Sequence, residues 1–177
     1  LEPGQTMPDP TTIETFNDSR IDHQDLSQGN SRYLRSLFKD LAALRRSHPV
    51  LSDLAKDRSQ VKKLAENVLS LQRWSEAGDR DVLAVYNTGT EEMTVDLRGG
   101  ELIQRIEGHQ QQERSTAGSW KELFSTADAK YGGAGDGFPE QLTFTRRGAA
   151  RLTIPAGTAV VFERSGEVST SPLNIQL

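Results

Sequence analysis

Apolar residues recur at helical spacing along one segment near the start of the chain. The stripe occupies positions i, i+3, i+4, i+7 and i+10 and consists of Leu34, Leu37, Phe38, Leu41 and Leu44. We expect an amphipathic helix over about residues 31–48, with Asn30 or Ser31 as its N-cap. Pro49 should end this helix, because proline disfavours the helical conformation of the residue before it.

After the helix, the apolar positions shorten to strand-like runs. Residues 81–87 are apolar on both faces, which predicts a central strand of a packed sheet. Residues 68–97 as a whole read as a three-stranded meander. Further strands are expected at 120–124, 142–145, 150–154 and 158–163. The pattern therefore predicts a mainly β fold, an antiparallel β-sandwich of Greek-key type preceded by one amphipathic α-helix.

The remaining segments carry turn and loop residues. We expect residues 1–30 to be irregular, 131–137 to form a glycine-dense loop, and 165–177 to form a loose tail. Residues 98–119, which are rich in Gly, Gln and Glu, indicate no single structure.

Composition and charge narrow the class of protein. Hydrophobic residues make up 34% of the 177, and the net charge is −4, so we expect a modest core and no nucleic-acid partner. No window approaches the roughly 20 apolar residues that cross a bilayer, and residues 1–10 contain no signal peptide. The absence of cysteine excludes disulfides and thiolate chemistry but leaves the compartment open between the cytoplasm and bacterial secretion.

The search for catalytic and binding residues finds no motif with a chemical role. His23, His48 and His109 lack metal-ligand spacing, and no serine lies in a nucleophile elbow. The acidic pairs Asp22 with Asp25 and Asp79 with Asp81 are read as solvated loop residues. We therefore predict no catalytic residue, no metal site and no cofactor. The aromatic residues that could stack on a sugar ring are Trp74, Trp120 and Tyr131.

A family resemblance runs through several of these segments. LAALRRSHPVL, ending the predicted helix, resembles the segment that closes the last barrel helix of α-amylase-family enzymes, glycoside hydrolase family 13. FNDSRID (16–22) resembles the stretch after the eighth barrel strand, with His23 in place of the usual Trp. NVLSLQRWSEAGDRDVLAVYNTGTEEMTVDL resembles the first hairpins of the family's C-domain, and IPAGTAVVFE resembles its closing strand. SWKELFSTADAKYGGAG is similar to C-domain segments of branching enzymes and maltooligosyltrehalose trehalohydrolases.

The resemblance covers about residues 11–164 and implies a division of the chain. Residues 1–50 would be the end of the catalytic barrel, 51–164 an all-β C-terminal domain, and 165–177 a tail. The family's three catalytic carboxylates follow barrel strands four, five and seven, so a chain that begins after strand eight would carry none of them. The resemblance thus implies a chain that is inactive alone, with the missing barrel of the same enzyme as its partner.

Two functional hypotheses follow. In the first, the chain is the non-catalytic C-terminal portion of a hydrolase or transglycosylase that acts on α-glucans such as starch or glycogen, and it stabilises the barrel. Without that barrel, the apolar stripe would pack on the sandwich, self-associate or hold a barrel fragment. In the second, the chain is a glucan-binding module. Exposed coplanar rings among the three aromatic residues would support the second hypothesis, and buried rings the first. The sequence favours no single bond specificity.

Overall fold

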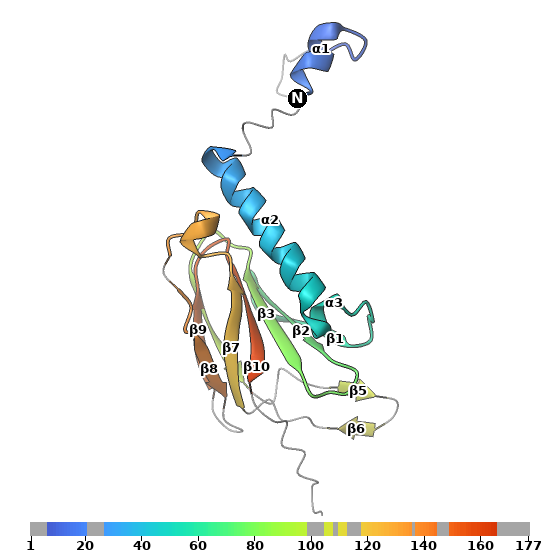
Figure 1. Ribbon diagram of the computed structural model, residues 1–177. Helices are drawn as coiled ribbons and strands as arrows, with labels where there is room; N and C mark the ends of the chain where they lie inside the picture. Colours follow the sequence, from blue (N-terminus) through green and yellow to red (C-terminus); the bar gives the residue numbers. More distant parts are fainter. Residues whose placement is uncertain are drawn as a thin grey trace, which may run out of the picture.

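The computed structural model describes residues 7–20, 27–98, 105–107, 110–112, 118–135, 137–144 and 149–165. A long helix lies beside two antiparallel sheets that pack face to face (Figure 1). The predicted fold class, a mainly β antiparallel sandwich preceded by an amphipathic helix, is confirmed. The predicted tail falls almost entirely outside the described residues.

Three α-helices precede the strands in the described residues. Helix α1 (Ile13–Asp18) begins at the N-cap Thr12, whose side chain accepts a hydrogen bond from the Thr15 amide, so the expectation of an irregular start was wrong for these residues. Helix α2 (Gly29–Ser47) begins slightly earlier than predicted, after the N-cap Gln28. His48 is extended and ends α2, as Pro49 requires, and the short helix α3 (Pro49–Ser52) follows directly.

The larger sheet has six strands in the order β1-β2-β3-β10-β7-β8, and all neighbours are antiparallel. In this order the strands are β1 (Ser59–Ala65), β2 (Val68–Trp74), β3 (Asp81–Asn87), β10 (Ala159–Ser165), β7 (Gly118–Ser125) and β8 (Gln141–Phe144). Strand β3 lies between β2 and β10 and is buried along nearly its whole length, which confirms the prediction of a central strand.

The second sheet corrects the predicted meander. Strand β4 (Met93–Arg98) does not pair with β3 but with β9 (Ala149–Ile154), in an antiparallel two-stranded sheet. The edge of β3 that a meander would need is occupied by β10. A further pair, β5 (Arg105–Glu107) with β6 (Gln110–Gln112), lies in the segment whose pattern indicated no structure.

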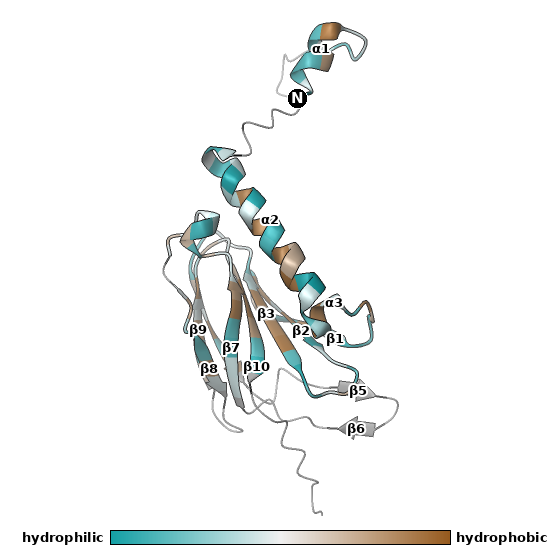
Figure 2. Ribbon diagram, viewed as in Figure 1, coloured by the Kyte–Doolittle hydropathy of each residue, from teal (hydrophilic) through white to brown (hydrophobic). Residues whose placement is uncertain are grey.

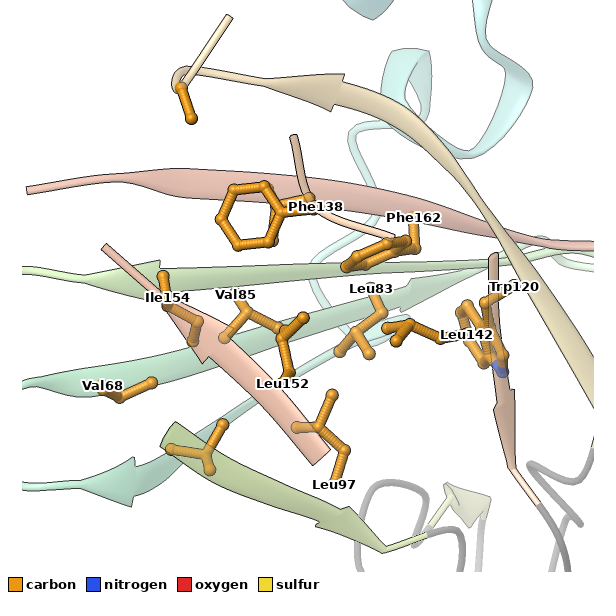
Figure 3. Packing of buried hydrophobic residues seen from close by; sticks show 13 residues of the cluster. Val68, Leu83, Val85, Leu97, Trp120, Phe138, Leu142, Leu152, Ile154 and Phe162 are labelled. Carbon is orange, nitrogen blue, oxygen red and sulfur yellow. The ribbon is translucent and has the colours of Figure 1, made fainter. Parts of the chain in front are cut away.

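The hydrophobic core lies between the two main sheets. The large sheet contributes Val68, Leu83, Val85, Trp120, Leu142, Val160 and Phe162, and the small one contributes Val95, Leu97, Leu152 and Ile154. Figure 3 shows these side chains meeting in the space between the strands. Each fully buried side chain of this kind stabilises the fold by about 1.5–3 kcal/mol relative to exposure.

Two buried polar contacts tie the strands of the sandwich together. The Asn87 amide nitrogen donates hydrogen bonds to the carbonyls of Glu91 and Ile154, at 2.8 and 3.0 Å, and so joins β3 to the end of β9. At the other end of β3, the Arg164 guanidinium lies 3.3 Å from the Asp81 carboxylate, and both side chains are buried. These contacts satisfy polar groups that would otherwise destabilise the core.

Candidate interaction surface

The apolar stripe of helix α2 is divided between a partly covered face and an open face. Leu37 and Leu44 are partly buried, whereas Leu34, Phe38 and Leu41 are 54%, 69% and 37% exposed. We call these last three residues the open face. Figure 2 shows the apolar residues of α2 alternating with polar ones along the helix. An amphipathic helix normally turns its apolar stripe to a core. Three large exposed side chains along one face of a helix therefore indicate a candidate interaction surface.

The C-terminal end of α2 is fixed to the large sheet through helix α3. Val50 of α3 is fully buried, and α3 packs against β2 and β3. His48, which is buried at the junction of the two helices, places its Nε2 atom 3.1 Å from a carboxylate oxygen of Glu163 on β10. The two atoms are in close contact, but their geometry is not that of a hydrogen bond. The open face therefore belongs to a helix that is anchored at its C-terminal end.

The middle of α2 contacts the segment that follows β7. The 3₁₀ turn η2 (Ala129–Tyr131) lies against the helix, and the Tyr131 hydroxyl donates a 2.7 Å hydrogen bond to the Asp40 carboxylate. This hydrogen bond is the main cause that lowers the pKa of Asp40, and burial raises the pKa of Tyr131. Asp40 lies outside the apolar stripe of the helix, so the hydrophobic periodicity could not predict its contact with Tyr131.

The three predicted sugar-stacking residues are all buried. Trp74 is 6%, Trp120 1% and Tyr131 9% exposed. Trp120 belongs to the core between the sheets, and the Tyr131 ring lies 5.2 Å from the Phe124 ring, centroid to centroid. These rings do not form an exposed coplanar pair, so the glucan-binding alternative is not favoured.

The acidic residues singled out in the sequence have local roles. Asp79 accepts a 2.6 Å hydrogen bond from Ser75 within a turn, and Asp81 is the buried partner of Arg164. The remaining pair, Asp22 with Asp25, and the histidines His23 and His109 lie outside the described residues. Across the ranges that the structure describes, no three His, Asp or Glu side chains are placed to hold a metal ion.

One carboxyl of the large sheet has a perturbed proton affinity. Burial raises the pKa of Glu122 on β7, and the negative charges of Asp128 and Glu140 raise it further. The folded state therefore disfavours the charged form of this side chain.

None of the helices in the described ranges has the length and apolar character needed to cross a membrane.

The fold agrees with comparisons to known proteins. Residues 107–165, which include strands β7 to β10, match the family profile described as "Alpha amylase, C-terminal all-beta domain". Residues 107–165, a third of the chain, are thus similar to the C-terminal all-β domain of α-amylase-family (glycoside hydrolase family 13) proteins. The predicted family resemblance is confirmed.

One curated protein and one solved structure illustrate the extent of this similarity. The chain is 46% identical over 55 residues to a malto-oligosyltrehalose trehalohydrolase of Brevibacterium helvolum, a match that covers 31% of this chain and 9% of the relative. The structure resembles that of an α-amylase from H. orenii with a TM-score of 0.52 and 17% identity, over 88% of this chain and 25% of the amylase. The second comparison shows a shared fold. Both proteins are several times longer than this chain.

Proposed function

We propose that this chain is the non-catalytic C-terminal portion of an α-amylase-family enzyme that acts on α-glucans. In this proposal, the open face of α2 docks on the enzyme's catalytic barrel and stabilises it. The observation that carries the proposal is the exposure of Leu34, Phe38 and Leu41 on a helix that is already anchored to the sandwich. An α-glucan enzyme is supported by the similarity of residues 107–165 to the α-amylase C-terminal domain and by the match to the trehalohydrolase.

The open face contributes part of the energy of an interdomain contact. Complete burial of a Leu or Phe side chain contributes about 1.5–3 kcal/mol. Because the three residues are about half exposed, covering them contributes roughly 3 kcal/mol in total. Glycosidic cleavage requires two carboxyl groups that flank the scissile bond. Asp79 lies in a turn and Asp81 in a buried ion pair, and the role that we assign to the chain is a structural one.

The proposal can be tested with the barrel and this chain produced as two separate polypeptides. The barrel would be the segment that precedes this chain in the parent protein. We expect the two to associate, and we expect the complex to have a higher Tm than the barrel alone. The variant Phe38→Glu should weaken association at least about tenfold, because a carboxylate would then lie in an apolar contact.

A matched variant separates this effect from a general change in the helix. Ala43→Glu introduces the same charge at an exposed position of α2 outside the open face, and it should associate like the wild type. Both variants should leave the stability of the isolated chain within about 0.5 kcal/mol, because both positions are exposed. The proposal fails if the wild-type chain does not bind the barrel, or if Phe38→Glu and Ala43→Glu bind it equally.

A further inference from the structure

The contact between α2 and the segment after β7 has two separate points on the helix. At the first, the Tyr131 hydroxyl donates to Asp40 at 2.7 Å, and Lys130 places its Nζ atom 3.4 Å from the same carboxylate oxygen. At the second, the ring of Tyr33 lies over Gly132. A β-carbon at Gly132 would lie 3.0 Å from the Tyr33 Cδ2 atom, so the close approach of the ring depends on glycine.

The segment that holds α2 is itself rigidly attached to the sandwich. Gly132 has a φ of +84°, a conformation that favours glycine. A β-carbon at Gly133 would lie 2.1 Å from the carbonyl oxygen of Ala127, a core residue two positions after β7. The Gly135 amide donates to that same carbonyl at 3.0 Å, and the Gly133 amide donates to Asp128 at 3.2 Å. The two contact points therefore connect the helix to the core.

The spacing of the contact points determines which way the apolar stripe faces. Tyr33 and Asp40 are seven residues apart, so they lie on one face of the helix about 10 Å from each other. The next residues in sequence, Leu34 and Leu41, are rotated by about 100° from them. Holding Tyr33 and Asp40 against the sandwich consequently turns Leu34 and Leu41 away from it.

We infer that Tyr33, Asp40, Tyr131 and Gly132 form a latch that sets the orientation of α2 and so the direction in which the open face points. The α3 anchor holds the C-terminal end of the helix, and the latch holds the part between Tyr33 and Asp40. The inference about orientation stands independently of the barrel. Its consequence, that the latch aligns the open face with a docking partner, rests on the proposed function.

Hydrogen exchange of the whole chain tests the latch. Tyr131→Phe removes the hydroxyl and keeps the ring, and Asp40→Ala removes the acceptor from a half-exposed helix position. Loss of one hydrogen bond should raise exchange of the α2 amides between residues 33 and 41 by about fivefold or more. Thr153→Val is the control, because it removes the 2.9 Å Thr94–Thr153 hydrogen bond on the other sheet. This control should leave α2 exchange unchanged.

A distance measurement tests orientation directly. The chain has no cysteine, so Ala42→Cys on α2 and Lys121→Cys on β7 provide two unique spin-label sites, both exposed. We expect one narrow distance distribution in the labelled chain with an intact latch, and a broader or shifted distribution when Tyr131→Phe is added. Unchanged exchange and an unchanged distribution in both latch variants would overturn the inference. Because these readouts need no barrel, failure of the latch can be told from failure of the wild-type chain to bind the barrel.

Discussion

Replacing Gly133 by alanine provides a sharp test of how the loop after β7 is packed. The added β-carbon would lie 2.1 Å from the Ala127 carbonyl oxygen, 2.3 Å from its carbonyl carbon and 2.7 Å from its α-carbon. All three are backbone atoms, so no side-chain rotation can relieve the clash. The loop must move by about 1 Å, since non-bonded carbon atoms pack at about 3.5–4.0 Å.

The magnitude follows from what this shift would disrupt. Overpacking costs about 1–3 kcal/mol. The hydrogen bonds from Gly133 to Asp128 and from Gly135 to Ala127 would be strained, each contributing about 0.5–1.5 kcal/mol. We expect Gly133→Ala to lower the free energy of unfolding by about 2–4 kcal/mol, a large part of the usual 5–15 kcal/mol.

Urea unfolding followed by tryptophan fluorescence measures this loss, because both tryptophans are buried in the folded state. Gly137→Ala is the matched control: a β-carbon there meets nothing within 4 Å, and the backbone is not left-handed. This control should change stability by less than about 1 kcal/mol, in the stabilising direction. A Gly133→Ala protein within 0.5 kcal/mol of the wild type, taken as roughly the limit for a neutral surface substitution, would refute the packing argument.

Three further predictions concern charge and exposure. Arg164→Ala should lower the free energy of unfolding in the urea assay by about 3–5 kcal/mol, because the buried Asp81 carboxylate loses its guanidinium partner. The control Arg151→Ala removes an exposed ion pair and should lower it by less than about 1 kcal/mol. Because burial raises the pKa of Glu122, the folded state binds its proton more tightly than the unfolded chain, so wild-type stability falls as pH rises through the interval between the two pKa values. Glu122→Gln should therefore raise the urea midpoint at neutral pH, and this gain should disappear below about pH 4; an equal gain at both pH values would contradict the assignment. Iodide should quench tryptophan emission weakly, and a maltooligosaccharide should not alter that quenching, whereas protection by the sugar would revive the glucan-binding alternative.

The sequence by itself determined the elements whose patterns are long and regular. The stripe from Leu34 to Leu44 predicted α2, and Pro49 located its end, because one proline restricts the residue before it whatever the tertiary context. The two-sided apolar run at 81–87 predicted a central strand, because only a strand covered on both faces can bury such residues. The motifs spread from 16 to 163 indicated the family resemblance.

Only the tertiary structure decided how these elements meet. Strand β4 has the alternation of a third meander strand but pairs with β9, because the free edge of β3 is taken by a strand some 70 residues later. The polar strand β1 (SQVKKLA) carries too few apolar residues to be recognised without β2 beside it. The latch joins Asp40 to Tyr131, which are 91 residues apart in the sequence. Hydrophobic periodicity describes residues that are close in sequence and therefore cannot predict such a pair. Division of the stripe into covered and open faces is likewise a property of the packing, since sequence specifies which residues are apolar but only the fold specifies which of them find a partner.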